Sequence, residues 1–431
     1  MMDISIVGTG YVGLVSAAGF AEKGHNVVCV DVDEDKVELI NNKKSPIYEE
    51  GLGEILSVVC DRNLKATTDL ESAVNSTEVT FICVGTPSGD DGVVDLRYIR
   101  GVSADLGKIL SKKDSYHVIV VKSTVIPGST EDVVIPLVEK NSKKKASSDF
   151  GVAMNPEFLR EGAAVEDFAN PDRIVIGALD QKSGDMVEQI YFDFTAPVLR
   201  TNVKTAEMIK YTANSLLATK ISFINEIGNM CKEMGIDVYD VAKGVGMDHR
   251  ISPSFLRAGP GFGGSCFPKD VSALVYKANK IGIKPILLES VLKVNSMQPL
   301  RVFELVKEKY GPLEGVQISV LGLAFKPGTD DMRYSPAISI INSLVSSGAK
   351  IMAYDPQAIE NAKKIFGDSI EFASSAEKAL KDSSLALILT DWEEFKNIDY
   401  SVMKEKRVFD TRKIVKTDLL PDDVEYEGLS W

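Results

Sequence analysis

A glycine-rich turn near the start of the chain constrains the fold more than any other stretch. Residues 4–7 are an apolar, mostly β-branched run, and Gly8-Thr-Gly-Tyr-Val-Gly13 follows it directly. An alanine-rich stretch and a second apolar run ending at Asp31 come next. The first glycine of this pattern allows a tight turn, the second lets a ligand reach the backbone, and the third lets helix and strand pack closely. The pattern predicts a β-α-β unit that starts a parallel sheet.

The same unit predicts a dinucleotide site, with a plain turn between strand and helix as the alternative. Phosphates bind at helix N-termini, where free N–H groups and the positive end of the helix dipole meet. Asp31 follows Gly13 by eighteen residues (31 − 13), a spacing that suits a carboxylate on ribose hydroxyls. Because a carboxylate there would repel a 2′-phosphate, the sequence favours NAD over NADP.

Further apolar runs predict buried strands at residues 79–84, 117–122, 150–154 and 173–177. Helical patterns separate them, which is typical of a parallel sheet covered on both faces. Ligands of such sheets bind at the carboxyl ends of the strands. The polar residues near these ends are therefore site candidates, and they are Thr86, Thr124, Glu157 and Glu161. Each threonine could instead cap a helix.

A helix of about thirty residues is predicted from Thr205 to Met234, and Gly235 ends it. It is long enough to bridge two domains, and its apolar faces could also pair with a second subunit. Lys210 and Asn214 are four residues apart, so they share one face of this helix. The alternatives are a solvated helix lysine and an asparagine used in polar packing.

A second glycine-rich loop, Gly259-Pro-Gly-Phe-Gly-Gly-Ser-Cys-Phe-Pro-Lys-Asp270, carries one cysteine. Its four glycines and two prolines prevent a long helix or a regular strand. A thiol at Cys266 could be exposed, activated near a cation and used as a covalent nucleophile. A tight turn around a buried, inert cysteine is the alternative. Asp270 could serve the chemistry, cap the following helix, or do both.

The last part of the chain predicts a second α/β sheet. Gly311-Pro-Leu-Glu-Gly315 interrupts the pattern, and apolar runs then occur at residues 317–324, 350–355, 385–390 and 408–410. The expected fold class is α/β, with two Rossmann-like doubly wound α/β domains joined by a central long-helix domain. The expected boundaries are 1–195 for the N-terminal NAD-binding domain, 196–310 for the central helical domain with the cysteine loop and a dimer interface, and 311–431 for the C-terminal domain.

Composition excludes several functional classes. The formal net charge of -13 and the pI of about 5.0 leave no basic footprint for nucleic acid, and the run at residues 143–145 is expected to be a solvated loop. No apolar run approaches the roughly 20 residues of a membrane helix, and no signal peptide is visible. Five widely spaced cysteines without a CxxC pair predict no metal site and a reducing, cytoplasmic setting.

Six motifs together resemble the UDP-glucose 6-dehydrogenases, within the wider UDP-glucose/GDP-mannose dehydrogenase family. They lie at residues 8–13, 85–87, 155–162, 170–174, 261–270 and 325–333, and the resemblance covers essentially the whole chain. It implies NAD-dependent, four-electron oxidation of UDP-glucose to UDP-glucuronate, with two NAD per sugar and a thiohemiacetal and thioester on the cysteine. It also implies a role in nucleotide-sugar metabolism and polysaccharide biosynthesis, a UDP-sugar-binding C-terminal domain, and a homodimer or higher homo-oligomer.

The resemblance implies a role for each matching residue. Cys266 matches the nucleophile, Lys210 and Asn214 the groups around the reacting oxygen, and Asp270, Glu157 and Thr124 those around the catalytic water. The implied cofactor contacts are Gly8, Gly10, Tyr11, Val12, Gly13, Asp31, Lys36, Thr86, Thr124, Glu161, Lys269 and Arg333. The implied substrate contacts are Phe158, Leu159, Arg160, Glu161, Lys210, Asn214, Arg250, Phe255, Leu256, Arg257, Ala258, Gly259, Gly263 and Lys326. Arg250 matches a residue that reaches a neighbouring subunit's site, and Phe255 replaces a frequent tyrosine.

The same reaction can be argued from the residue types without the resemblance. Oxidising an alcohol to an acid takes two hydride transfers, and a thiolate can trap the intermediate aldehyde. Three alternatives remain at this stage. The substrate could be GDP-mannose or an N-acetylated UDP-hexosamine. The chain could be a two-electron β-hydroxyacid dehydrogenase, which needs neither Cys266 nor a second α/β domain. It could also be a non-enzymatic sensor of NAD or a sugar nucleotide.

Overall fold

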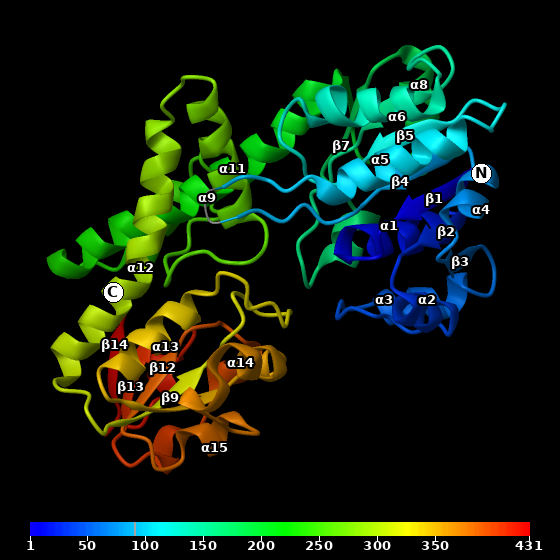
Figure 1. Cartoon of the computed structure of the whole chain (residues 1–431). Coiled ribbons are helices and arrows are strands. Elements are labelled where there is room, and N and C mark those ends of the chain that lie inside the picture. Colours follow the sequence, from blue (N-terminus) through cyan, green and yellow to red (C-terminus); the bar gives the residue numbers. More distant parts are fainter. Residues whose placement is uncertain (90–91) are drawn as a thin grey trace. The chain divides into compact units, whose positions relative to one another are not determined.

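The computed structural model describes residues 1–89 and 92–431 (Figure 1). The chain divides into two compact units, Met1–Ala213 and Asn214–Trp431. The division falls within one long helix, α9 (Val203–Met234). The predicted helix of about thirty residues is therefore confirmed, with its start two residues earlier. The predicted three-domain boundaries stay a prediction.

The described part of the first unit contains an eight-stranded sheet in the order β3-β2-β1-β4-β5-β6-β7-β8. Its central strands are short and fully buried, which explains their almost continuous apolar content. The strands are β1 (Asp3–Val7), β2 (Asn26–Val30), β3 (Leu64–Thr67), β4 (Val79–Ile82), β5 (Val118–Val121), β6 (Gly151–Met154), β7 (Ile174–Ala178) and β8 (Val198–Thr201).

The prediction of a fully parallel sheet is wrong at one place. Strand β7 pairs antiparallel with β6, and β8 then pairs parallel with β7. All other neighbours in this sheet are parallel. A strand buried on both faces has the same apolar composition in either direction, so the pattern of residues 173–177 could not reveal the reversal.

Helices cover both faces of this sheet. On one face Phe20 of α1 packs with residues of α3, α7 and α8, and on the other Leu106 of α5 packs with η1, α6 and the start of α9. The helices of this unit are α1 (Tyr11–Glu22), α2 (Glu34–Asn41), α3 (Leu52–Val59), α4 (Leu70–Asn75), α5 (Arg97–Leu110), η1 (Thr130–Val134), α6 (Ile135–Ser142), α7 (Ala164–Ala169) and α8 (Gln181–Ile190).

In its described residues the second unit contains a six-stranded parallel sheet in the order β11-β10-β9-β12-β13-β14. Its strands are β9 (Gln317–Leu321), β10 (Lys350–Tyr354), β11 (Glu371–Phe372), β12 (Leu385–Ile388), β13 (Arg407–Asp410) and β14 (Glu425–Gly428). The second α/β sheet predicted for this part of the chain is confirmed.

In the described part of this unit, α10, α11 and α12 precede the sheet in the chain, and the later helices lie between its strands. Residues of α12, α13 and α14 pack in one core cluster, and residues of α15, η3 and η4 pack in another. Ser335 caps α13, since its hydroxyl accepts the Ala337 N–H at 3.3 Å. The helices are α10 (Val238–Gly246), α11 (Phe267–Lys280), α12 (Ile286–Tyr310), α13 (Pro336–Ser346), α14 (Ile359–Phe366), η2 (Gly367–Ser369), α15 (Ala376–Leu380), η3 (Glu393–Asn397), η4 (Tyr400–Val402) and η5 (Thr417–Leu419). Among the described helices, none is long and apolar enough to cross a membrane.

We expect Phe20→Ala to lower the free energy of unfolding by about 3–5 kcal/mol, because it removes a fully buried ring from a well-packed core. The Phe20 ring lies 5.1–5.3 Å, between centroids, from those of Phe81, Phe168 and Tyr191. Urea denaturation followed by circular dichroism measures the change. Phe192→Ala is the control, since that ring is 66% exposed. Equal shifts of the urea midpoint in both variants would contradict the packing assigned to Phe20.

Candidate active site

The glycine turn between β1 and α1 fits a phosphate-binding loop. A Cβ added to Gly13 would lie 1.8 Å from the Gly8 carbonyl oxygen, so the third glycine is needed for close packing. A Cβ added to Gly10 would meet no atom within 4 Å, and no side chain caps α1 at this residue. Open space therefore borders the free N–H groups of the helix, where the pyrophosphate of a dinucleotide binds.

Asp31, directly after β2, is a carboxylate held by three hydrogen bonds. Its Oδ2 accepts the Thr9 N–H at 2.8 Å and the Thr9 hydroxyl at 2.5 Å, and its Oδ1 accepts the Asp33 N–H at 3.1 Å. Burial favours the neutral acid, but these hydrogen bonds and the charge of Lys36 outweigh it and hold the pKa of Asp31 below its usual value. A carboxylate in this place fits a ribose diol, as the sequence predicts.

Lys210 and Glu157 form a buried ion pair in the first unit. The Lys210 Nζ lies 2.7 Å from the Glu157 Oε1, and the two side chains are only 3% and 6% exposed. Burial opposes ionisation of Glu157, but the charge and hydrogen bond of Lys210 and the Leu159 N–H outweigh it and lower the pKa of Glu157. Lys210 is therefore not the solvated helix lysine of the alternative interpretation. Two residues of the predicted catalytic set meet here.

The two threonines at the strand ends contact each other. The Thr86 hydroxyl donates to the Thr124 carbonyl oxygen at 2.8 Å, so Thr86 links two neighbouring strand ends and does not cap a helix. Strands β4 and β5 are adjacent in the sheet, which explains why residues 38 apart in the chain meet. This pairing brings together two of the strand-end residues that the sequence analysis selected as site candidates.

Glu49 is a structural partner of the site that sequence reasoning missed. Its carboxylate accepts the Gly162 N–H at 2.8 Å and the Ala164 N–H at 2.6 Å, and it thereby fixes the turn that follows Glu161. The neighbouring Tyr48 accepts a hydrogen bond of 2.9 Å from the Tyr11 hydroxyl on its carbonyl oxygen. Glu49 belongs to no periodic pattern of residues in the sequence. Its role is seen only from its long-range contacts with Gly162 and Ala164.

The remaining candidates of the first unit are oriented by neighbours. Arg173 stacks over the Phe158 ring, 3.9 Å from its centroid, and Lys210 faces the same ring at 5.6 Å. Arg160 makes a forked pair with Asp167, at 2.9 Å and 2.6 Å. Leu159 and Val12 pack against the core. Contacts with Arg173, Asp167 and the core thus fix the segment 157–161.

In the second unit Cys266 stands at the start of α11. It occupies the N-cap position, is half-buried, and its Sγ lies 3.6 Å from the Ser265 Oγ. The positive end of the helix dipole favours a thiolate there. Asp270 lies within the first turn, so the N-cap role considered for Asp270 belongs to Cys266 instead.

Asn214 and Asp270 make a second buried contact. The Asn214 Nδ2 donates to the Asp270 Oδ2 at 2.6 Å, and the Lys269 Nζ lies 3.0 Å from the Asp270 Oδ1. Asp270 is 1% exposed. Both predicted catalytic residues of α9 therefore have a carboxylate partner, Lys210 in the first unit and Asn214 in the second.

The glycines of the cysteine loop let it pack against residues 325–334. The Gly264 N–H donates to the Arg333 carbonyl oxygen at 2.7 Å. A Cβ added to Gly263 would lie 2.4 Å from the Tyr334 carbonyl oxygen, so a larger residue would push the two loops apart. Arg333 itself is held by Asp331 through two hydrogen bonds of 2.9 Å and 2.8 Å.

The predicted substrate contacts at residues 255–259 form a second ordered loop. Phe255 has a left-handed backbone (φ 64°), which is uncommon for an aromatic residue and marks a constrained turn. Arg257 pairs with Asp391 at 2.6 Å, and the Ala258 carbonyl accepts the Tyr239 hydroxyl at 2.9 Å. Leu256 is buried against α9 and α10, Gly259 donates its N–H to the Asn225 side chain, and Lys326 faces the Phe325 ring.

Arg250 differs from these candidates because it is exposed. Its guanidinium forms a forked pair with Asp248, at 3.0 Å and 2.6 Å, and its side chain is 77% exposed. Among the described residues, no cluster of side chains suited to hold a metal ion occurs.

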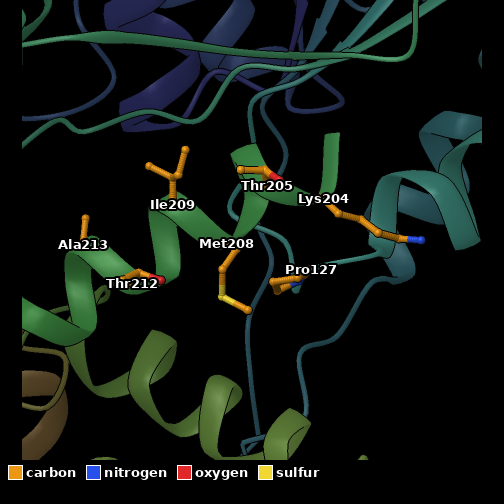
Figure 2. A pocket seen from close by; sticks show the side chains of 7 residues that line it. All are labelled: Pro127, Lys204, Thr205, Met208, Ile209, Thr212 and Ala213. Carbon is orange, nitrogen blue, oxygen red and sulfur yellow. The ribbon is translucent and has the colours of Figure 1, made fainter. Parts of the chain in front are cut away.

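A surface pocket of the first unit lies on another side of α9 (Figure 2). Figure 2 shows the Met208 side chain directed toward Pro127. The other lining residues are Lys204, Thr205, Ile209, Thr212 and Ala213. None of the predicted site residues lines this pocket, so this pocket is not the predicted site.

Three sequence models of one family match the chain in order. The model described as the UDP-glucose/GDP-mannose dehydrogenase family, NAD binding domain, matches residues 2–195. The central domain model of that family matches residues 204–297, and its UDP binding domain model matches residues 319–417.

Individual relatives match over the full length. The UDP-glucose 6-dehydrogenase AglM of Haloferax volcanii is 44% identical, over 99% of this chain and 100% of its own. A GDP-mannose 6-dehydrogenase of Pseudomonas syringae pv. tomato is 40% identical over 100% of both chains. A solved structure of a UDP-glucose dehydrogenase from Pyrobaculum islandicum has a TM-score of 0.95 at 40% identity, over 100% of this chain and 98% of the other.

We expect substitutions at two glycines of this turn to have different effects, one on NAD binding and the other on folding. Gly10→Ala should leave the melting temperature nearly unchanged but weaken NAD binding at least about tenfold, because the added Cβ occupies the space where the phosphates approach. Gly13→Ala should lower the melting temperature itself, since its Cβ collides with the Gly8 carbonyl. Calorimetric titration with NAD and thermal unfolding test the pair. Unweakened NAD binding by the Gly10 variant would contradict the phosphate site.

Proposed function

Because the chain belongs to the UDP-glucose/GDP-mannose dehydrogenase family and is an NAD-dependent oxidoreductase, we propose that it oxidises UDP-glucose to UDP-glucuronate. The observation that carries the proposal is the cysteine at the N-terminus of α11, followed by an aspartate bonded to Asn214. A two-electron alcohol dehydrogenase needs no such thiol. The residues at the glycine turn fit NAD, with Gly8 to Gly13 at the phosphates and Asp31 at a ribose.

UDP-glucose is the substrate that fits best. The C-terminal segment matches a UDP binding domain, and the relative from Haloferax volcanii is a UDP-glucose 6-dehydrogenase. The segment Asn155-Pro-Glu-Phe-Leu-Arg-Glu161 also resembles the UDP-glucose branch. The second candidate is GDP-mannose, because a GDP-mannose 6-dehydrogenase is 40% identical over the whole chain.

The first oxidation converts the primary alcohol of the sugar to an aldehyde. The glycine turn would hold NAD, which would supply the acceptor for one hydride per oxidation, so a second NAD would have to replace the first NADH before the second oxidation. In the proposal Lys210 and Asn214 donate hydrogen bonds to the substrate oxygen and stabilise the charge that develops on it. One such donor typically contributes about 10²–10³-fold to the rate.

Cys266 then keeps the aldehyde from escaping. Its thiolate adds to the aldehyde carbon and forms a thiohemiacetal, whose carbon loses the second hydride to become a thioester. Water attacks this thioester, the C–S bond breaks, and the acid and the free thiolate result. Glu157, Asp270 and Thr124 are proposed to hold this water and take its proton. Glu157 suits the task because it is ionised at neutral pH.

We also propose that two copies of the chain pair through α9. Leu216, Phe223 and Met230 recur every seven residues along this helix and are 60%, 55% and 50% exposed. Apolar side chains at this spacing form one stripe, which is typical of a helix that packs against a partner helix.

Phe223→Glu should reduce the molecular mass in solution from that of a dimer, or a multiple of it, to that of a monomer. The reason is that a carboxylate would replace an apolar ring at the centre of the stripe. Sedimentation equilibrium measures the mass. Leu419→Glu is the control, because Leu419 is an apolar residue that is also exposed, at 66%, but lies in η5 and not in α9. An unchanged mass for the Phe223 variant would remove α9 as the interface.

The central test counts NADH formed per sugar consumed, with limiting UDP-glucose and excess NAD. Two NADH per UDP-glucose are expected, with UDP-glucuronate as the product. Cys266→Ser should still bind UDP-glucose but form the acid at least about 10³-fold more slowly, since the thioester cannot form. Cys60→Ser is the matched control, because Cys60 is also half-buried but lies at the end of α3, where its thiol donates to the Ile40 carbonyl oxygen.

One NADH per sugar, or normal turnover by Cys266→Ser, would contradict the thioester route. No NADH with UDP-glucose but two with GDP-mannose or an N-acetylated UDP-hexosamine would keep the chemistry and change the substrate. Binding without turnover of any of these would favour a sensor.

A further inference from the structure

A buried lysine that has no role in the proposed chemistry lies beside the candidate site of the first unit. Lys122 follows β5 directly and is 4% exposed. Its Nζ donates to the Asn155 Oδ1 at 2.9 Å and to the Tyr191 hydroxyl at 3.3 Å. A buried ammonium is rare unless it is paired or has a function.

Lys122 fixes the start of the turn that carries Glu157. The Asn155 Oδ1 also accepts the Tyr191 hydroxyl at 2.6 Å, and the Asn155 Nδ2 donates to the Val175 carbonyl at 2.9 Å. Asn155 is the first residue after β6, and Glu157 is two residues further on. The side chain of Asn155 is thus held in one orientation by Lys122, Tyr191 and β7.

The charges around Lys122 are those of the candidate site. Burial lowers the pKa of Lys122 to about 8, with Cys83 and Glu157 opposing the shift and Lys210 adding to it. Burial raises the pKa of Cys83 to about 12 and that of Tyr191 well above its usual value, so both are neutral near pH 7. Glu157 and Lys210 are therefore the charged groups that face Lys122 near neutral pH.

We propose that Lys122 is a positioning residue for the oxidation, which orients the turn from Asn155 to Glu157 and keeps Glu157 ionised beside Lys210. The inference rests on the proposed function, in which Glu157 takes a proton from water. The sign of the effect follows from the charges. A positive Lys122 lowers the pKa of Glu157, so loss of this charge raises that pKa and removes the active carboxylate at a higher pH.

The test compares Lys122→Met and Lys122→Arg with the unchanged enzyme from about pH 3.5 to pH 9, a range that reaches below the ordinary glutamate pKa of about 4.3. The Met variant should lower kcat about 10–100-fold, as small misplacements of catalytic groups do, and change KM less than about threefold. The acid limb of its kcat–pH profile, where activity falls as Glu157 becomes protonated, should move upward by about 0.5–1 pH unit. The Arg variant keeps the charge, so its acid limb should stay where the unchanged enzyme has it.

Lys113→Met is the matched control. Lys113 is another buried lysine of this unit, 8% exposed, which donates to the carbonyl oxygens of Val74 and Thr77 beside His117. Its loss should lower the melting temperature without moving the acid limb. If Lys122→Met behaves in the same way, Lys122 is only structural and the proposal fails.

A double-variant cycle tests whether Lys122 acts through Glu157. In a Glu157→Gln background, Lys122→Met should cause no further shift of the acid limb, because the group that titrates is gone. A shift of the same size in both backgrounds would overturn the proposal.

A measurement without turnover separates this inference from the proposed function. Carboxyl ¹³C NMR of the glutamate-labelled protein, with Glu157→Gln to identify the signal, gives the pKa of Glu157. A higher pKa in Lys122→Met supports the inference even if no UDP-glucuronate is formed. An unchanged pKa overturns it even if the enzyme makes UDP-glucuronate with two NADH. If the Met variant does not fold, Lys122→Gln replaces it.

Discussion

The ion pair between Lys210 and Glu157 is the interaction on which the rest of the first unit depends. It lies where a strand end meets the long helix α9, and both side chains are almost fully buried. Removing one partner of such a pair leaves an uncompensated charge and costs about 3–5 kcal/mol. Glu207, one turn earlier on α9, accepts the N–H groups of Gly128 and Thr130. Two carboxylates therefore join the start of α9 to the loops at the strand ends. The contacts that stabilise this unit thus include the residues proposed for the chemistry.

The second unit follows a related rule. Cys266 begins a helix, Asp270 lies one turn further on, and Asn214 of α9 donates to it. Glu157 lies just after β6, and Cys266 and Asp270 lie at the start of α11, where regular backbone meets unpaired peptide groups, whereas Lys210 and Asn214 lie within α9. Glycines at residues 263 and 264 let neighbouring loops approach these groups closely. The cysteine is thus presented by an ordered loop and not by a flexible one.

The sequence predicted the interior strands of the two sheets but not their edge strands. The central strands of both sheets were predicted because they are continuous apolar runs. The four strands that the sequence analysis did not predict, β3, β8, β11 and β14, are the four edges of the two sheets. Edge strands are partly exposed and contain charged residues such as Lys65, Arg200 and Glu425. They are held in place by pairing with a neighbour, which no local pattern of residues reveals. The reversed direction of β7 escaped prediction for the same reason.

By itself the sequence determined the α/β class, the glycine turn for NAD, the long helix and the family, because each depends on local spacing along the chain. It also selected Lys210 with Asn214, on one face of a helix, and Glu157 with Asp270, through the family resemblance. Only the tertiary structure decided that Lys210 pairs with Glu157 and Asn214 with Asp270, since each partner lies more than fifty residues away. The same holds for Lys122, the last residue of the strand predicted at residues 117–122. Its partners Asn155 and Tyr191 come from other elements, and burial among them, which a sequence does not display, makes an ordinary lysine an electrostatic part of the site.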